Sequence, residues 1–168
     1  MRKYLTIVDK HKASSGIRFI NYVLDRIFIQ IIFYMTFFML GMLYTIIYGE
    51  VIDGKAIDND QVATFYIFVF YLVLSFLYFF FMEYYLGRTL AKYITGTEVV
   101  SIDGAKPDIQ QIISRTFIRA VPFNSLSFLG QNGWHDSWSE TKVINRKNYH
   151  TEKQAKSEID DLGRKEIL

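Results

Sequence analysis

The stretch "IFIQIIFYMTFFMLGMLYTIIY", residues 27–48, runs for 22 positions without a formal charge. A second stretch, "VATFYIFVFYLVLSFLYFFFM" at residues 62–82, does the same over 21 positions. An α-helix rises about 1.5 Å per residue, so each stretch reaches roughly 30 Å, the thickness of a hydrocarbon core. The sequence therefore predicts two transmembrane helices. The alternative, a pair of buried helices in a soluble protein, is disfavoured because such helices rarely stay uncharged for so long.

The composition supports a membrane protein. Of the 168 residues, 51% are hydrophobic and 17% are aromatic, and the net charge is only +2. This length predicts one domain plus a tail, and the weak net charge gives no reason to expect a nucleic-acid partner. Because the chain contains no cysteine, disulfides and thiolate metal sites are excluded. The first stretch exceeds a signal-peptide core and no small-residue cleavage pattern follows it, so we expect it to persist in the mature protein.

The distribution of charge predicts the topology. Between the two stretches lies an acidic loop with Glu50, Asp53, Asp58 and Asp60 against a lone Lys55. The first 26 residues hold six Lys and Arg, and the residues after Met82 hold twelve. The positive-inside rule then places the loop outside and both termini in the cytoplasm.

The remaining segments are shorter and more polar. "TEVVSI" followed by Asp103 and Gly104 predicts a small hairpin over residues 97–109. Residues 109–130 predict an amphipathic helix in the inner interface, broken at Pro122, because only about ten uncharged residues follow Arg119, too few to cross. The prediction is an all-α membrane protein with a cytoplasmic segment (1–15), a membrane domain (16–144) and a charged, solvated and partly helical tail (145–168).

Charged residues gather around the predicted cytoplasmic boundary. On a helix Arg18, Asn21 and Asp25 share one face, at the end of the first span. The later residues that should reach the same boundary are Arg115, Arg119, His135 and Asp136. We interpret the aspartates as partners of these arginines in a structural clamp. The alternative is that Asp25 or Asp136 takes up a proton or cation, since ionisable groups in membranes are often functional.

Four motifs carry a family resemblance. Two hold the matching charged residues: "IRFINYVLDRI" with Arg18 and Asp25, and "GWHDSWSETKVI" with Asp136. Two support them: "LGRTLAKYITGTEVVSIDGAKP" and "SRTFIRAVPF". In this order and spacing they resemble the RDD family of integral membrane proteins, named for one arginine and two aspartates. The resemblance implies a bacterial plasma (inner) membrane and an association with transport and cation/proton exchange. The chain departs from longer relatives in having no convincing third span after Arg119.

No feature of the sequence indicates an enzyme. His135 and Asp136 are neighbours and would point about 100° apart on a helix, and no HExxH, GxSxG or phosphate-binding loop is present. We therefore expect neither cofactor nor metal. Two functional hypotheses remain, with the lipid bilayer and either a homo-oligomer or another membrane protein as partners. One is a small transporter or transport accessory for cations, protons or small solutes; the other is a membrane-embedded scaffold or assembly factor.

Overall fold

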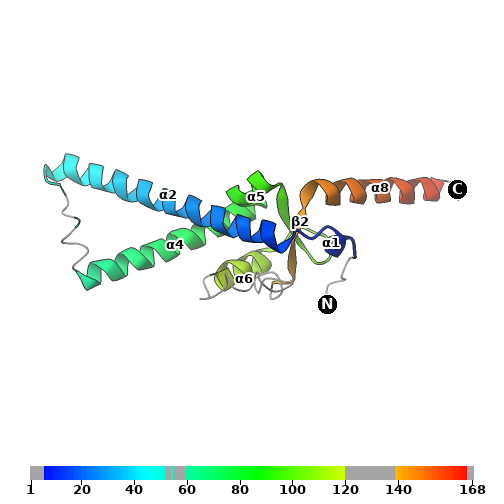
Figure 1. Cartoon of the computed structure of the whole chain (residues 1–168), viewed down its shortest axis with the longest axis horizontal. Helices are drawn as coiled ribbons and strands as arrows, with labels where there is room; N and C mark the ends of the chain where they lie inside the picture. The colour runs from blue at the N-terminus through cyan, green and yellow to red at the C-terminus, as the bar shows by residue number, and fades with distance from the viewer. Residues whose placement is uncertain (1–5, 52–53, 55–59, 120–138, 166–168) are drawn as a thin grey trace.

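The computed structural model of the chain describes residues 6–51, 54, 60–119 and 139–165. It is mostly helical and contains one small antiparallel sheet (Figure 1). The elements, in chain order, are α1 (Thr6–Lys10), α2 (Ser15–Tyr48), α4 (Gln61–Leu86), α5 (Leu90–Thr95), β1 (Thr97–Ser101), α6 (Ile109–Arg119), β2 (Thr141–Asn145) and α8 (Arg146–Lys165).

Helices α2 and α4 contain the two predicted spans, and both are long and apolar enough to cross a membrane. Each has a side-chain cap at its start. The Ser14 hydroxyl accepts a hydrogen bond from the Ile17 amide, and the Asp60 carboxylate accepts one from the Val62 amide. Each ends at a glycine with positive φ, Gly49 at 73° and Gly87 at 67°. At 34 residues α2 is about 50 Å long, so it extends well beyond a bilayer core.

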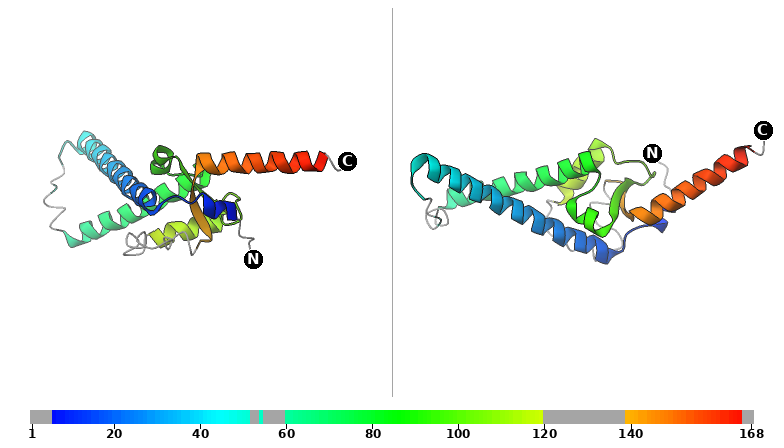
Figure 2. Two further views of the ribbon diagram at one scale, coloured as in Figure 1. Left: turned by 45° about the vertical axis from the view of Figure 1, so that its right-hand side comes forward. Right: turned by 90° about the horizontal axis from the view of Figure 1, so that it is seen from above.

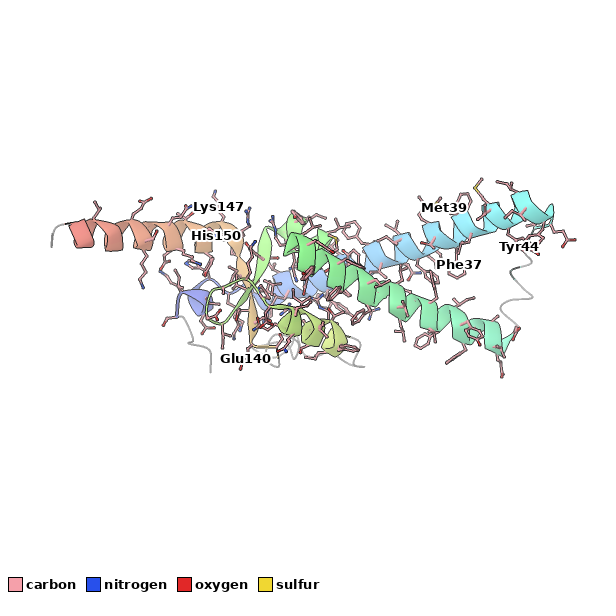
Figure 3. All side chains as sticks on the ribbon, turned by 180° about the vertical axis from the view of Figure 1, so that it is seen from behind. Phe37, Met39, Tyr44, Glu140, Lys147 and His150 are labelled. Atoms are coloured by element: carbon pink, nitrogen blue, oxygen red, sulfur yellow. The ribbon has the colours of Figure 1, made fainter. Side chains whose placement is uncertain are left out.

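The two long helices lie closest near α5 and diverge toward the loop that joins them (Figure 1). Aromatic rings bridge them near the middle, with Phe33 and Tyr71 centroids 5.4 Å apart and Phe37 and Phe70 centroids 5.7 Å apart. Phe37 points toward α4, whereas Met39 points away from it and is 70% exposed (Figure 3). Most of the apolar surface of both helices is therefore available to lipid.

The sheet corrects the predicted local hairpin over residues 97–109. Strand β1 pairs antiparallel with β2, and Thr97 lies opposite Asn145. After β1 the chain turns through Gly104 (φ 74°) and leads into α6 instead of returning beside β1. The physical reason is that an isolated two-stranded hairpin is only marginally stable, whereas the long-range pair is covered on both faces.

The two faces of the sheet contact different helices. Register places Thr97, Ser101 and Thr141 on one face, which receives side chains from α2 and α6. The other face contributes Val100 and Ile144 to a small apolar core completed by two further residues, Val8 and Tyr149. Each face mixes polar and apolar side chains, because Val99 and Val143 share the first face and Glu98 and Lys142 share the second.

Helices α6 and α8 fall within the predicted interfacial segment (109–130) and the predicted tail (145–168). Helix α6 packs against α4 and buries one side, which includes Ile112, Arg115 and Thr116. It accounts for the described half of the predicted interfacial segment 109–130; Pro122 and the rest lie outside the described residues. Helix α8 forms most of the predicted tail and points away from the spans (Figures 1 and 2), with its first turn docked through Tyr149.

Candidate functional site

The N-terminal part of α2 turns a polar face toward the protein. Its buried residues are Arg18, Asn21, Asp25 and Ile29, which follow one another at helical spacing. The predicted polar stripe is therefore the buried face of the helix. Its apolar neighbours, such as Phe19 and Ile20, are exposed. This is the reverse of the pattern in a water-soluble amphipathic helix.

Asp25 joins three helices. Its Oδ1 accepts hydrogen bonds from the Tyr78 hydroxyl of α4 at 2.8 Å and from the Ala91 amide of α5 at 3.3 Å. Its Oδ2 accepts from the Thr89 hydroxyl at 2.8 Å. Thr89 occupies the N-cap position of α5 but makes no capping bond with its own side chain. Asp25 therefore supplies the cap and a negative charge to the start of a helix elsewhere in the chain.

Asn21, one turn earlier, binds the other end of α5. Its amide nitrogen donates to the Thr97 hydroxyl at 3.0 Å, and its carbonyl accepts from the Thr95 hydroxyl at 2.6 Å. The Thr95 and Thr97 hydroxyls are themselves 3.0 Å apart. Asn21 thus fixes the junction between α5 and β1 against α2, and Asp25 fixes the opposite end of α5.

Glu83 forms a second polar centre at the end of α4. Its Oε1 lies 2.5 Å from Lys92 Nζ of α5 and 2.7 Å from Arg119 Nη2 of α6, and its Oε2 lies 3.3 Å from Arg115 Nε. The side chains of Glu83, Lys92 and Arg115 are each at most 3% exposed. One carboxylate therefore links α4, α5 and α6 through three cations.

The Glu83 centre extends to the sheet through Arg115. This guanidinium also donates through Nη1 to the Thr141 hydroxyl of β2, which is 2.7 Å from the Ser139 hydroxyl. Arg119 in turn lies over the Phe79 ring, with Cζ 4.3 Å from the centroid. We call the two connected centres around Asp25 and Glu83 the polar clamp.

Burial lowers the pKa of one member of the clamp, Lys92, toward neutral pH. Desolvation lowers the pKa of Lys92 to about 8; Glu83 opposes this shift, and Arg119 and Arg115 reinforce it. Lys92 is thus a buried group whose proton affinity falls close to the physiological range. The described residues contain no group of three or more His, Cys, Asp or Glu that could hold a metal ion.

The clamp contains some of the predicted site residues in roles that differ from the prediction. Asp25 forms no ion pair with Arg18, Arg115 or Arg119 within the described chain, so that part of the prediction is wrong; hydroxyl and amide donors bind it instead. Arg18 is 2% exposed and donates to the Ser15 hydroxyl. His135 and Asp136, and their predicted pairing, lie outside the described residues.

The sequence analysis missed Glu83, the partner that Arg115 and Arg119 do have. The sequence does contain a feature that indicates Glu83: it is a single acidic residue that directly follows 21 uncharged positions and precedes a segment rich in Lys and Arg. An isolated carboxylate at the end of a span is costly unless cations reach it. Lys92 was also missed, although it follows Glu83 by only nine residues.

These features describe two helices that are long and apolar enough to span a membrane, with the shorter elements held against them by a buried polar clamp. The family model that matches the chain is that of the RDD family, over residues 12–139, and the chain belongs to this family. The matched residues include Arg18, Asp25 and the whole Glu83 centre. Searches of curated proteins and of solved structures each find no match.

Proposed function

We propose that the chain is a non-enzymatic membrane scaffold or accessory subunit that holds a small folded unit at the membrane surface for a partner. The observation that carries this proposal is that both oxygens of Asp25 are engaged by α4, α5 and Thr89 of the same chain. A carboxylate with this set of partners positions helices, which is the clamp interpretation of the family's polar residues.

The arrangement of the sheet and α8 also fits a scaffold that presents a folded unit to a partner. One face of the sheet is hydrogen-bonded to α2 and α6, and Val100 and Ile144 on the other face pack with Tyr149 in the first turn of α8. Residues 153–159 of α8 are exposed, and the helix projects away from the spans (Figure 2). The excess of Lys and Arg on the segments flanking the spans supports an orientation with both termini in the cytoplasm. The membrane in this proposal is a bacterial plasma membrane.

The partner in this proposal is a second copy of the chain or another membrane protein. Two diverging helices bury little surface between them, and residues such as Phe38 and Met39 stay largely exposed. Association in lipid depends on close packing and polar contacts, both of which a neighbouring helix could add along these faces.

A second candidate, a small transporter or transport accessory for cations or protons, is favoured by a separate observation. Lys92 is buried beside Glu83 and has a pKa lowered to about 8, so a proton can leave it near neutral pH. Two helices cannot enclose a pathway alone, so this function requires an oligomer in which the Glu83 centre opens to an aqueous route.

One pair of measurements separates the two functions. Asp25→Asn and the matched surface variant Asp9→Asn are reconstituted in proteoliposomes, and cation-driven proton flux and thermal stability are recorded for each. The scaffold predicts that Asp25→Asn lowers stability while flux stays at the level of empty liposomes in every sample. Flux in the unaltered chain that disappears in well-folded Asp25→Asn would contradict the scaffold and support transport.

Partner capture tests the platform itself. Removing residues 155–168 deletes the projecting part of α8 but keeps Tyr149, Glu152 and Lys153, which dock its first turns. The scaffold predicts that this truncated chain stays folded and captures less of its partner from solubilised membranes. Unchanged capture would show that α8 is not the docking element.

A further inference from the structure

A cleft of about 360 Å³ lies between α4 and α6, beside the polar clamp, with which it shares Arg119. Its walls include three aromatic rings, Phe76 and Phe79 from α4 and Phe117 from α6. The polar residues that line it are Arg26, Ser75, Thr116 and Arg119. Because α4 is one of the two spanning helices, the cleft borders the hydrocarbon region. Lipid can therefore cover its apolar walls.

The surroundings of the Arg26 guanidinium differ from those of the clamp arginines. It donates to the Tyr71 hydroxyl at 3.1 Å and lies 5.6 Å from the Tyr22 ring centroid. No ion pair of Arg26 is formed within the described chain, in contrast to Arg115 and Arg119, which share Glu83. Arg26 directly precedes Ile27, where the uncharged run of α2 begins, and its partner Tyr71 lies near the middle of the uncharged run of α4.

Two buried donors point to an acceptor that the described residues do not supply. The Ser75 hydroxyl and Arg119 Nη1 are buried and have no hydrogen-bond partner in the described part of the chain. Leaving such donors unsatisfied is unfavourable, and more so for a charged group. Glu83 and the Phe79 ring fix the Arg119 guanidinium, so Nη1 cannot easily turn away.

We infer that the cleft binds an anionic phospholipid. The phosphate oxygens would accept from Arg26 and the unsatisfied donors, and an acyl chain would cover Phe76, Phe79 and Phe117. Charge complementarity favours this occupant, since a cation and two unsatisfied donors meet apolar walls in one cleft. A free phosphate would satisfy the donors but leave the aromatic walls bare, and a neutral lipid would leave Arg26 uncompensated.

Native mass spectrometry of the full chain, exchanged from phosphatidylglycerol or phosphatidylcholine vesicles into mild detergent, tests the site. The unaltered chain should retain one phosphatidylglycerol and little phosphatidylcholine. Arg26→Gln should retain about tenfold less, the loss expected for one charge-assisted hydrogen bond. The matched control is Arg88→Gln, which removes the same charge from a guanidinium stacked 4.1 Å from the Tyr93 centroid, away from the cleft. Equal retention by both variants, or by both lipids, would overturn the inference.

Photo-crosslinking distinguishes a built site from general contact with lipid. A benzophenone side chain replaces Phe117, which is 61% exposed and lines the cleft, or Phe38, which is 64% exposed on α2. In mixed vesicles the Phe117 probe should capture phosphatidylglycerol in preference to phosphatidylcholine, whereas the Phe38 probe should capture both in proportion. A Phe117 adduct with another part of the chain, or with a second copy, would replace the lipid as occupant and contradict the inference.

Discussion

The two ends of α2 expose and bury opposite kinds of side chain. Near its start Arg18, Asn21 and Asp25 are buried, and Asn21 and Asp25 are bonded to other elements. Toward its end Ile46 and Ile47 are 76% and 62% exposed. Helix α4 repeats the contrast, since Glu83 is its one buried residue. Along α2 and α4 the buried side chains are therefore polar, with Ile29 as the exception.

The reason is the solvent. Lipid tails are as apolar as leucine, so removing a side chain from lipid gains little, and helices associate through packing and hydrogen bonds. The small core around Val8, Val100, Ile144 and Tyr149 resembles that of a soluble protein. We therefore expect stability to respond most to changes in the polar clamp and least to changes on the exposed parts of the spans.

The largest effect should come from Glu83→Ala. This change leaves Lys92, Arg115 and Arg119 near one another without their shared carboxylate, and breaking a buried ion pair typically costs about 3–5 kcal/mol. Thermal unfolding in detergent should show a severely destabilised or unfolded chain. Glu50→Ala, beyond the end of α2, is the matched control and should unfold like the unaltered protein. Similar midpoints for both variants would remove Glu83 from the clamp.

The next effect compares two apolar positions on one helix. Ile29 is fully buried beside the clamp, whereas Met39 is 70% exposed. Ile29→Ala should cost about 2–4 kcal/mol because it leaves a cavity, whereas Met39→Ala should stay within about 0.5 kcal/mol. Denaturation in detergent micelles measures both. An equal loss at the two positions would mean that the whole of α2 is packed against protein.

A smaller, pH-dependent effect belongs to Lys92. Because its pKa is lowered to about 8 from the ordinary 10.5, the folded chain loses this proton before the unfolded chain does. The unaltered protein should therefore gain stability relative to Lys92→Met as pH rises from about 8 toward 10.5, by roughly 1 kcal/mol per pH unit. Paired melting curves across this range test the sign. A difference that is constant or falls with pH would contradict the burial of a charged Lys92.

The smallest effect should come from the surface ion pairs of α8. Lys10 and His11 lie 2.7 Å and 2.6 Å from Glu152 Oε2. Their hydrogen bonds lower the pKa of Glu152, so any stabilisation is lost only as pH falls below the ordinary range of a glutamate. At neutral pH Glu152→Gln should melt within error of the unaltered chain, since exposed pairs contribute little. A clear loss would mean that α8 docks through this pair more than through Tyr149.

Much of the architecture could be predicted from the sequence, because hydrocarbon thickness imposes a minimum length on spanning helices. The uncharged runs at 27–48 and 62–82 fall within α2 and α4, and the helical spacing of Arg18, Asn21 and Asp25 identified a face that is indeed shared. Composition alone did not show whether that face would be buried. The structure does, through Thr89, Thr95 and Thr97.

The remaining features depend on contacts between distant segments. The β1 partner lies in "TKVIN", forty residues after β1, while the nearby Asp103 and Gly104 favoured a local turn. Asp25 was expected to pair with arginine because opposite charges attract, but Arg115 and Arg119 reach Glu83 instead. Asp25 and Glu83 are two carboxylates at the same boundary. Sequence spacing alone cannot show which of them Arg115 and Arg119 reach, because that depends on where helix α6 packs.

A double-mutant cycle between Asp25 and Thr89 tests the structural role of the clamp most directly. Asp25→Asn and Thr89→Val, singly and together, remove the bond between Oδ2 and the Thr89 hydroxyl with little change in shape. The clamp predicts a coupling of about 1–2 kcal/mol in unfolding free energy. The same cycle with Thr36→Val, whose hydroxyl bonds the Ile32 carbonyl within α2, should show none. Additive effects of Asp25→Asn and Thr89→Val, within about 0.5 kcal/mol, would contradict the claim that Asp25 holds α5 to the spans.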